Sequence, residues 1–194
     1  MLLIIEHYFR SYTARKKVAE VLYKNGLSVR NSKIYSGEVE IPISSIASVA
    51  GVNRKIVYHT IEFIEKNYPL KVIFEKMYPA PNLSEIAPEM GWDVLEIEIK
   101  RGKFACTIGK VISALFDYKC HIRQVLGEEP ITGTGRLTIV LEGTIPVDII
   151  SQIREVKGVG AISLHTSQTD MDKLVCNFCE VKYCPRRVPD VEAV

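Results

Sequence analysis

The chain has 194 residues, of which 47% are hydrophobic and 25% are charged, and its formal net charge is +2. These fractions are typical of globular proteins and exclude disordered and fibrous classes. The length exceeds that of a typical domain of about 100 to 150 residues, so two compact modules are expected. No apolar run approaches the ~20 residues of a membrane-crossing helix, and Glu6 and His7 interrupt the apolar start too early for a signal peptide. We therefore expect a cytoplasmic protein with no membrane partner.

The charge is unevenly distributed along the chain. Residues 1–79 contain 12 Lys and Arg against 7 Asp and Glu, whereas residues 80–168 contain 9 against 11. An excess of positive charge in the first module suits a polyanionic partner, although many solvated surfaces carry a similar excess.

Apolar periodicity predicts helices and a hairpin in residues 1–79, the first expected domain. Helices are expected over 13–24, from a cap at Ser44 to Ala50, and from a cap at Asn53 to about Asn67. Alternation around Ser36 and Gly37 predicts a β-hairpin over 29–41. Residues 70–78 are expected to form a strand that pairs with "EVEI" (38–41) in a wing-like sheet.

The stretch "SSIASVAGVNRKIVYHTIEFIEK" (44–66) resembles the helix-turn-helix motif of transcriptional regulators. Ile46 and Ala47 stand where the motif has an apolar residue followed by a small one, and Gly51 stands at its turn. Val52 follows the turn, and Val57 takes the buried position of the recognition helix.

The helix-turn-helix resemblance implies a DNA-binding surface. The helix from Ser44 to Ala50 would brace the DNA backbone, Arg54 and Lys55 would meet phosphates, and Tyr58 and His59 would lie nearest the bases. The expected DNA-binding residues are Ser44, Asn53, Arg54, Lys55, Tyr58 and His59. The alternative is a three-helix cluster that contacts other proteins.

A Pro-rich linker over 80–91 precedes a second expected domain, residues 92–168. Its predicted elements are a strand over 92–100, a helix over 104–115, strands over 121–127 and 136–143, a helix from Pro146 to Val156 and a last strand over 159–166. Each helix has one apolar stripe, so both helices must lie on one face of a four-stranded antiparallel sheet. This βαββαβ order predicts an α+β protein with a ferredoxin-like second domain. The exposed face or edges of such a sheet favour a homodimer.

The segment "KRGKFACTIGKVISALFDYKCHIRQV" (100–125), together with "IREVKGVGAISL" (153–164), resembles the ACT domain, a small-molecule sensing module of amino-acid metabolism. The resemblance implies an effector, usually an amino acid, at Arg101, Gly102, Lys103 and Phe104, with His121 where the family often has Asn. The amides of a helix start and Lys103 suit a carboxylate independently of the resemblance. Lys100 replaces the family's usual Asp or Asn, which favours a small anion over an amino acid. The alternative is a dimerisation module that binds no ligand.

The whole chain resembles predicted, mainly archaeal, regulators of amino-acid metabolism that combine a helix-turn-helix with an ACT domain. This resemblance implies a ligand-responsive transcriptional regulator that binds double-stranded DNA, forms a homodimer and performs no enzymatic reaction. Two alternatives remain open: a metabolic regulatory subunit that does not bind DNA, and a metal or redox sensor that acts through protein contacts.

The tail, residues 169–194, places Cys176, Cys179 and Cys184 in the spacing C-x2-C-x4-C. Thiolates at this spacing are typical of a zinc site or an iron–sulfur cluster. A fourth ligand would come from Cys106, Cys120, His165, a partner subunit or an exogenous group. Free or disulfide-bonded cysteines are the alternative.

Overall fold

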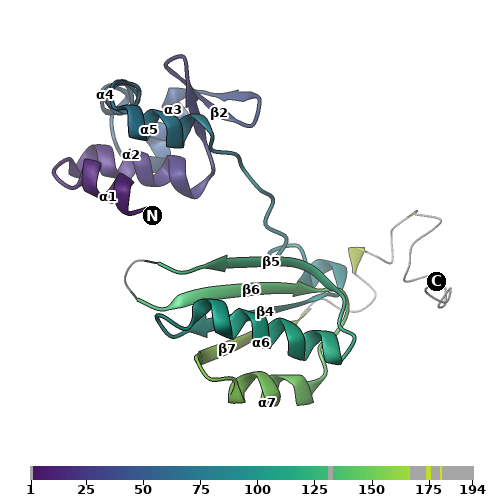
Figure 1. Ribbon diagram of the computed structural model, residues 1–194. Coiled ribbons are helices and arrows are strands. Elements are labelled where there is room, and N and C mark those ends of the chain that lie inside the picture. The colour runs from purple at the N-terminus through teal and green to yellow at the C-terminus, as the bar shows by residue number, and fades with distance from the viewer. Residues whose placement is uncertain (1, 131–132, 167–173, 176–179, 181–194) are drawn as a thin grey trace. The chain divides into compact units, whose positions relative to one another are not determined.

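The computed structural model describes residues 2–130, 133–166, 174–175 and 180. The chain divides into two compact units, residues 1–81 and 82–194 (Figure 1). Each unit has its own apolar core, and each is described below by itself.

The described part of the first unit contains five helices and a small antiparallel sheet of order β1-β2-β3. In chain order, its elements are α1 (Leu3–Phe9), α2 (Thr13–Lys24), β1 (Ser28–Arg30), β2 (Lys33–Ser36), β3 (Val39–Ile41), α3 (Ile43–Ala50), α4 (Arg54–Lys66) and α5 (Tyr68–Glu75). Every helix contributes to one core, and its fully buried side chains include Phe9, Leu22, Ile34, Val57, Ile61, Ile64, Leu70 and Phe74.

The sequence-based expectations for 13–24, for the hairpin at Ser36 and Gly37 and for the helix after Asn53 are confirmed. The expected strand over 70–78 is wrong, because most of this stretch forms α5. Leu70 and Phe74, four residues apart, are fully buried, as one face of a helix requires. Pro69 stands in the first turn of α5, where the missing amide hydrogen of proline costs nothing. The small sheet forms from residues 28–41 alone.

Ser44 does not cap α3. The N-cap position belongs to Pro42, and no described side chain caps this helix. The carbonyl of Pro42 accepts a hydrogen bond from the amide of Ser45 at 3.0 Å, so α3 begins at Ile43 and Ser44 is an exposed residue of its first turn. Ile43 packs against the core, which favours its inclusion in the helix.

The second unit contains a four-stranded antiparallel sheet of order β5-β6-β4-β7. Its elements are a 3-10 turn, η1 (Pro88–Met90), followed by β4 (Asp93–Ile99), α6 (Phe104–Asp117), β5 (Ile122–Glu128), β6 (Gly135–Leu141), α7 (Val147–Glu155) and β7 (Val159–His165). The protein is therefore an α+β protein with the predicted ferredoxin-like βαββαβ order.

The two faces of this sheet differ. Leu95, Ile97 and Ile99 alternate along β4 towards α6 and α7, which lie together on one face (Figure 1). On the opposite face, Val94 and Val140 pack against a smaller cluster of apolar side chains from the segment before β4, namely Leu83, Ala87 and Trp92. Further along that opposite face, polar residues such as Glu96 and Thr138 pair across β4 and β6.

Among the described helices, none combines the length and the apolar character that a membrane crossing requires.

Candidate functional sites

The turn between α3 and α4 has the geometry that the sequence predicts for a helix-turn-helix. Gly51 ends α3 in the left-handed region, with φ of +63°, and its amide donates to the carbonyl of Ser48 at 3.2 Å. The side chain of Asn53 caps α4, because its Oδ1 accepts a hydrogen bond from the amide of Ile56 at 3.0 Å. The turn therefore fixes where the first exposed residues of α4 lie.

Helix α4 has one buried face and one exposed face. Val57, Thr60, Ile61 and Ile64 are buried, and the Thr60 hydroxyl donates to the carbonyl of Ile56 at 2.7 Å. The hydroxyl at this buried position is thus satisfied within the helix.

The exposed face of α4 carries the residues expected to contact DNA. Arg54, Lys55, Tyr58 and His59 are all exposed, and 56% of the Tyr58 surface is accessible. A cationic first turn with an aromatic and an imidazole ring behind it offers donors for phosphates and for base edges.

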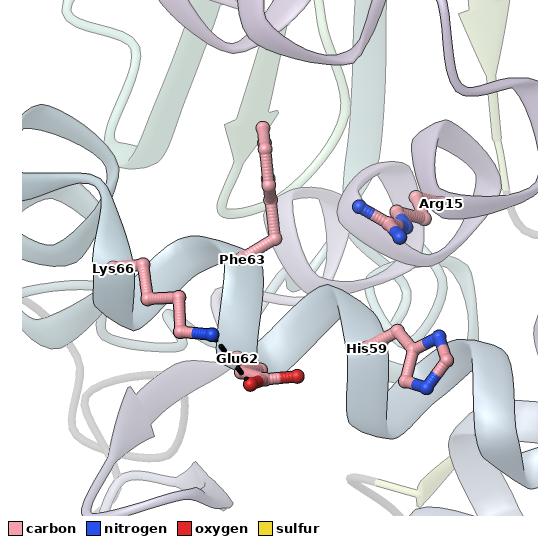
Figure 2. A pocket seen from close by; sticks show the side chains of 5 residues that line it. All are labelled: Arg15, His59, Glu62, Phe63 and Lys66. Carbon is pink, nitrogen blue, oxygen red and sulfur yellow. Dashed lines mark hydrogen bonds and ion pairs between the residues drawn. The ribbon is translucent and has the colours of Figure 1, made fainter.

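Two further cations, Lys66 of α4 and Arg15 of α2, extend this exposed face, and the sequence does not predict the position of Arg15. A depression of about 270 Å³ is lined by Arg15, His59, Glu62, Phe63 and Lys66 (Figure 2). Arg15 comes from α2, and its guanidinium lies 4.8 Å from the ring centre of Tyr12 and 5.5 Å from that of Phe63. These cation–π contacts hold Arg15 beside α4. No spacing in the sequence links Arg15 to His59, because their proximity depends on the packing of α2 against α4.

Glu62 is the one acidic residue among the described residues that line this depression, and Lys66 Nζ lies 2.6 Å from its Oε1 (Figure 2). The hydrogen bond from Lys66, followed by the charges of Lys66, His59 and Arg15, lowers the pKa of Glu62. Glu62 therefore remains ionised at neutral pH and offsets part of the positive charge around it.

The loop expected to bind an effector connects β4 to α6. Gly102 has φ of +70°, and its amide donates to Glu129 Oε1 at 2.9 Å. Arg101 and Lys103 are exposed beside it. The carboxylate of Glu129 thus accepts a hydrogen bond from the Gly102 amide, one of the amides that we expected to bind an anionic ligand. The sequence reasoning missed Glu129, which lies in the β5–β6 connection.

Phe104 begins α6 and packs inward. Its ring lies so close to Gly135 that a Cβ atom at that position would stand 2.5 Å from Phe104 Cδ2, and a Cβ at Gly127 would stand 3.1 Å from Cζ. Two glycines on neighbouring strands therefore make room for this ring, and Phe104 is partly buried against the core.

His121 does not join the loop within one chain. It precedes β5 beside the start of β4, because Ile122 pairs with Leu141 and Leu141 pairs with Asp93. The 101–104 loop follows the other end of β4. About seven residues of strand, roughly 23 Å, separate the two positions.

The predicted metal ligands Cys176, Cys179 and Cys184 lie outside the described residues. Of the possible fourth ligands, Cys106 is exposed, and its thiol donates to the carbonyl of Lys103 at 3.1 Å. Cys120 is half-buried, and burial raises the pKa of its thiol. His165 is on β7, and its Nε2 atom lies 3.7 Å from the Oε2 atom of Glu96. Over the described ranges, no group of three His, Cys, Asp or Glu side chains is placed to hold a metal ion.

Comparison with known proteins yields distant structural similarities. No family model and no curated protein matches the chain. Among solved structures, the ACT domain of a GTP pyrophosphokinase of Chlorobium tepidum is similar to 38% of this chain over 96% of its own length, with 12% identity and a TM-score of 0.31.

Two longer similarities include both units. A transcriptional regulator of Neisseria meningitidis in complex with L-Met covers 84% of this chain and 92% of its own, with 10% identity and a TM-score of 0.26. An AsnC family transcriptional regulator from Agrobacterium tumefaciens covers 84% and 93%, with 7% identity and a TM-score of 0.27. Similarities this distant carry no functional argument, so the proposals below depend on the residues of this chain.

Proposed function

We propose that this protein is a ligand-responsive transcriptional regulator of amino-acid metabolism that binds double-stranded DNA through α4. The observation that supports DNA binding most directly is the capped, outward-facing start of α4. Arg54, Lys55, Tyr58 and His59 are exposed there, and Asn53 fixes the direction of the helix. Arg15 and Lys66 add positive charge to the same surface through the depression they share with His59. Phosphate contacts would orient the helix, and Tyr58 and His59 would contact the bases.

The test is binding of the full chain to duplex DNA selected from a randomised pool. The double variant Arg54→Ala with Lys55→Ala should weaken binding to every sequence in the pool, because it removes two cations that would neutralise phosphates. The matched control is Lys71→Ala with Lys76→Ala, which removes the same charge from exposed positions in and after α5. The control should bind DNA nearly as well as the wild type.

Tyr58→Ala and His59→Ala should instead reduce the preference for the selected sequence over random DNA. If the α4 and α5 double variants weakened DNA binding equally, the effect would come from the net charge of the protein, and specific contacts by α4 would be contradicted. Absence of any DNA binding would favour the metabolic regulatory subunit that acts through protein contacts.

The proposed effector site is the loop from Arg101 to Phe104, for an amino acid or a related small anion. Arg101 and Lys103 supply positive charge, and Gly102 lets the ligand approach the backbone. An incoming carboxylate would replace Glu129 at the Gly102 amide, so Glu129 competes with the ligand. Thermal unfolding of the full chain in the presence of each amino acid and of simple carboxylates tests this site. A stabilising anion should lose its effect in Arg101→Ala with Lys103→Ala and act at lower concentration in Glu129→Gln.

A homodimer and a metal-binding tail complete the proposal. The edge strands β5 and β7 are both seven residues long, and Val125 and Leu164 expose 42% and 36% of their surfaces. Exposed edges of this length favour pairing with a second copy. Light scattering should therefore give twice the mass of the chain.

Metal analysis of protein purified without oxygen should find zinc or iron, and Cys176→Ser with Cys179→Ser should remove it.

A further inference from the structure

A depression of about 420 Å³ lies on the sheet face that α6 and α7 leave uncovered. Its base is formed by β4, β5 and β6, and one wall is the chain segment 82–85. Two hydrogen bonds hold this wall. The amide of Leu83 donates to Gln124 Oε1 at 2.9 Å, and the amide of Ser84 donates to Asn82 Oδ1 at 3.0 Å. The volume falls within the range of small-molecule sites, about 300 to 1,000 Å³.

A polar side chain without a partner forms the floor of the depression. Thr138 is 8% exposed, and its neighbours Leu137 and Ile139 point to the opposite, helix-covered face. In the part of the chain that the structure describes, the Thr138 hydroxyl makes no hydrogen bond. Thr138 lines the depression, so its hydroxyl can donate a hydrogen bond to a ligand there or accept one from it.

The charges around Thr138 include both signs. Arg136 stands two residues before Thr138 on β6, Glu128 on the neighbouring strand β5 pairs with Arg136, and Glu96 on β4 pairs with Thr138. Glu85 joins them from the wall. The Cβ atoms of directly paired residues on neighbouring strands lie about 4.5 to 5.5 Å apart, and all four charged residues line the same depression.

Three carboxylates and one guanidinium give the lining two more negative than positive charges. Over the described ranges, Glu85, Glu128 and Arg136 form no ion pair, and Glu96 lies 3.7 Å from His165. The carboxylates are not gathered as metal ligands, since no described group of three acidic, His or Cys side chains could hold a metal ion. The lining therefore suits an organic ligand with one anionic group and more than one cationic group.

We propose that this depression binds a basic α-amino acid. The ligand carboxylate contacts the Arg136 guanidinium, its two cationic groups lie among Glu85, Glu96 and Glu128, and Thr138 hydrogen-bonds it from the floor. Leu126 offers apolar surface for the methylene chain. The site is separate from the loop at 101–104, and it does not depend on DNA binding by α4.

Isothermal titration calorimetry of the full chain with L-lysine tests whether the depression binds a basic amino acid. Norleucine matches lysine in length but lacks its side-chain ammonium, and cadaverine matches it but lacks the carboxylate. Both should bind at least about 10-fold more weakly than L-lysine, because each leaves charged groups of the site unpaired. Trp92 is the only tryptophan of the chain and packs against Val94 and Val140 on the same sheet face, so its fluorescence provides a second measurement.

Variants test the residues individually. Glu96→Gln and Arg136→Met should each weaken L-lysine binding about 10-fold. Glu155→Gln removes one carboxylate from an exposed position on α7 and should leave the affinity unchanged. Thr138→Val should weaken binding without lowering the thermal unfolding midpoint, because it removes a hydroxyl that has no partner among the described residues of the free protein.

Three results would overturn the assignment: no binding of L-lysine, equal binding of norleucine and cadaverine, or wild-type affinity in both Glu96→Gln and Arg136→Met. Loss of L-lysine binding in Arg101→Ala with Lys103→Ala alone would move the ligand to the loop and support the effector site proposed above instead. None of these results tests DNA binding by α4, which is measured separately.

Discussion

Asn53 shows how one side chain links the local sequence to the proposed DNA surface. Its Oδ1 accepts a hydrogen bond from the amide of Ile56, which satisfies one of the free amides at the start of α4. This role was predictable from the sequence, because Asn directly before an amphipathic run is a strong N-cap signal. Ser44 carried a similar signal and is not a cap, since Pro42 takes the N-cap position and the helix begins at Ile43.

We expect Asn53→Ala to lower the free energy of unfolding by about 1 kcal/mol, because the variant has no cap. Asn53→Asp should keep the cap and the stability, since an aspartate caps helices equally well. It should nevertheless weaken DNA binding, because it places a negative charge beside Arg54 and Lys55. Urea denaturation and a DNA titration of both variants check this pair of outcomes. Equal DNA affinity of Asn53→Asp and wild type would argue against contact between DNA and the start of α4.

Glu62 gives a second prediction about charge. The pKa of Glu62 is lowered chiefly by the hydrogen bond from Lys66. The stability that the Glu62–Lys66 pair contributes is therefore present above the ordinary pKa of a glutamate, and it is lost as the pH falls through the lowered value. At neutral pH, Glu62→Gln should therefore strengthen DNA binding several-fold, because it removes a negative charge beside His59 and Arg15. Glu75→Gln, at the exposed end of α5, is the matched control and should have no effect. An unchanged affinity in Glu62→Gln would place DNA away from this depression.

The elements of the chain differ in how well the sequence specified them. Inward-facing apolar residues recur at every second position along β4 and β6, so these two strands followed from the period of two. The stretch 70–78 has apolar residues at Leu70, Val72, Ile73 and Phe74, which fits both a strand and a helix. Pro69 could end α4 or begin α5, and the structure shows that it begins α5. The sequence did not predict helix α1, because it spans only seven residues. Its Ile5 and Phe9, four residues apart, are fully buried.

Substitutions along α5 distinguish the helix from the strand. Phe74→Ala should cost about 3 to 5 kcal/mol in the free energy of unfolding, and Leu70→Ala about 2 to 5 kcal/mol, because both side chains are fully buried. Val72→Ala should cost clearly less, since Val72 is only half-buried. A strand would bury residues 70, 72 and 74 alike. Comparable losses of stability at all three positions in urea denaturation would therefore contradict the helix.

At the scale of the whole molecule, the sequence predicted a helical first unit and a ferredoxin-like second unit. It did not predict which side chains from different elements share a site. Arg15 and His59 lie on different helices, and Glu129 reaches Gly102 from a different loop. Thr138, Glu96 and Arg136 come together only once the strand order is known. Such groupings depend on tertiary packing and strand order, which single-sequence periodicity does not encode.

The measurement that tests the central proposal most directly is the salt dependence of DNA affinity, by fluorescence anisotropy with one selected duplex. For the wild type, the logarithm of the binding constant should fall linearly with the logarithm of salt concentration. In Arg54→Ala with Lys55→Ala, the slope should be less steep by about 0.9 for each phosphate that the variant no longer neutralises. An affinity independent of salt, or the same slope in the wild type and the double variant, would contradict DNA binding through α4.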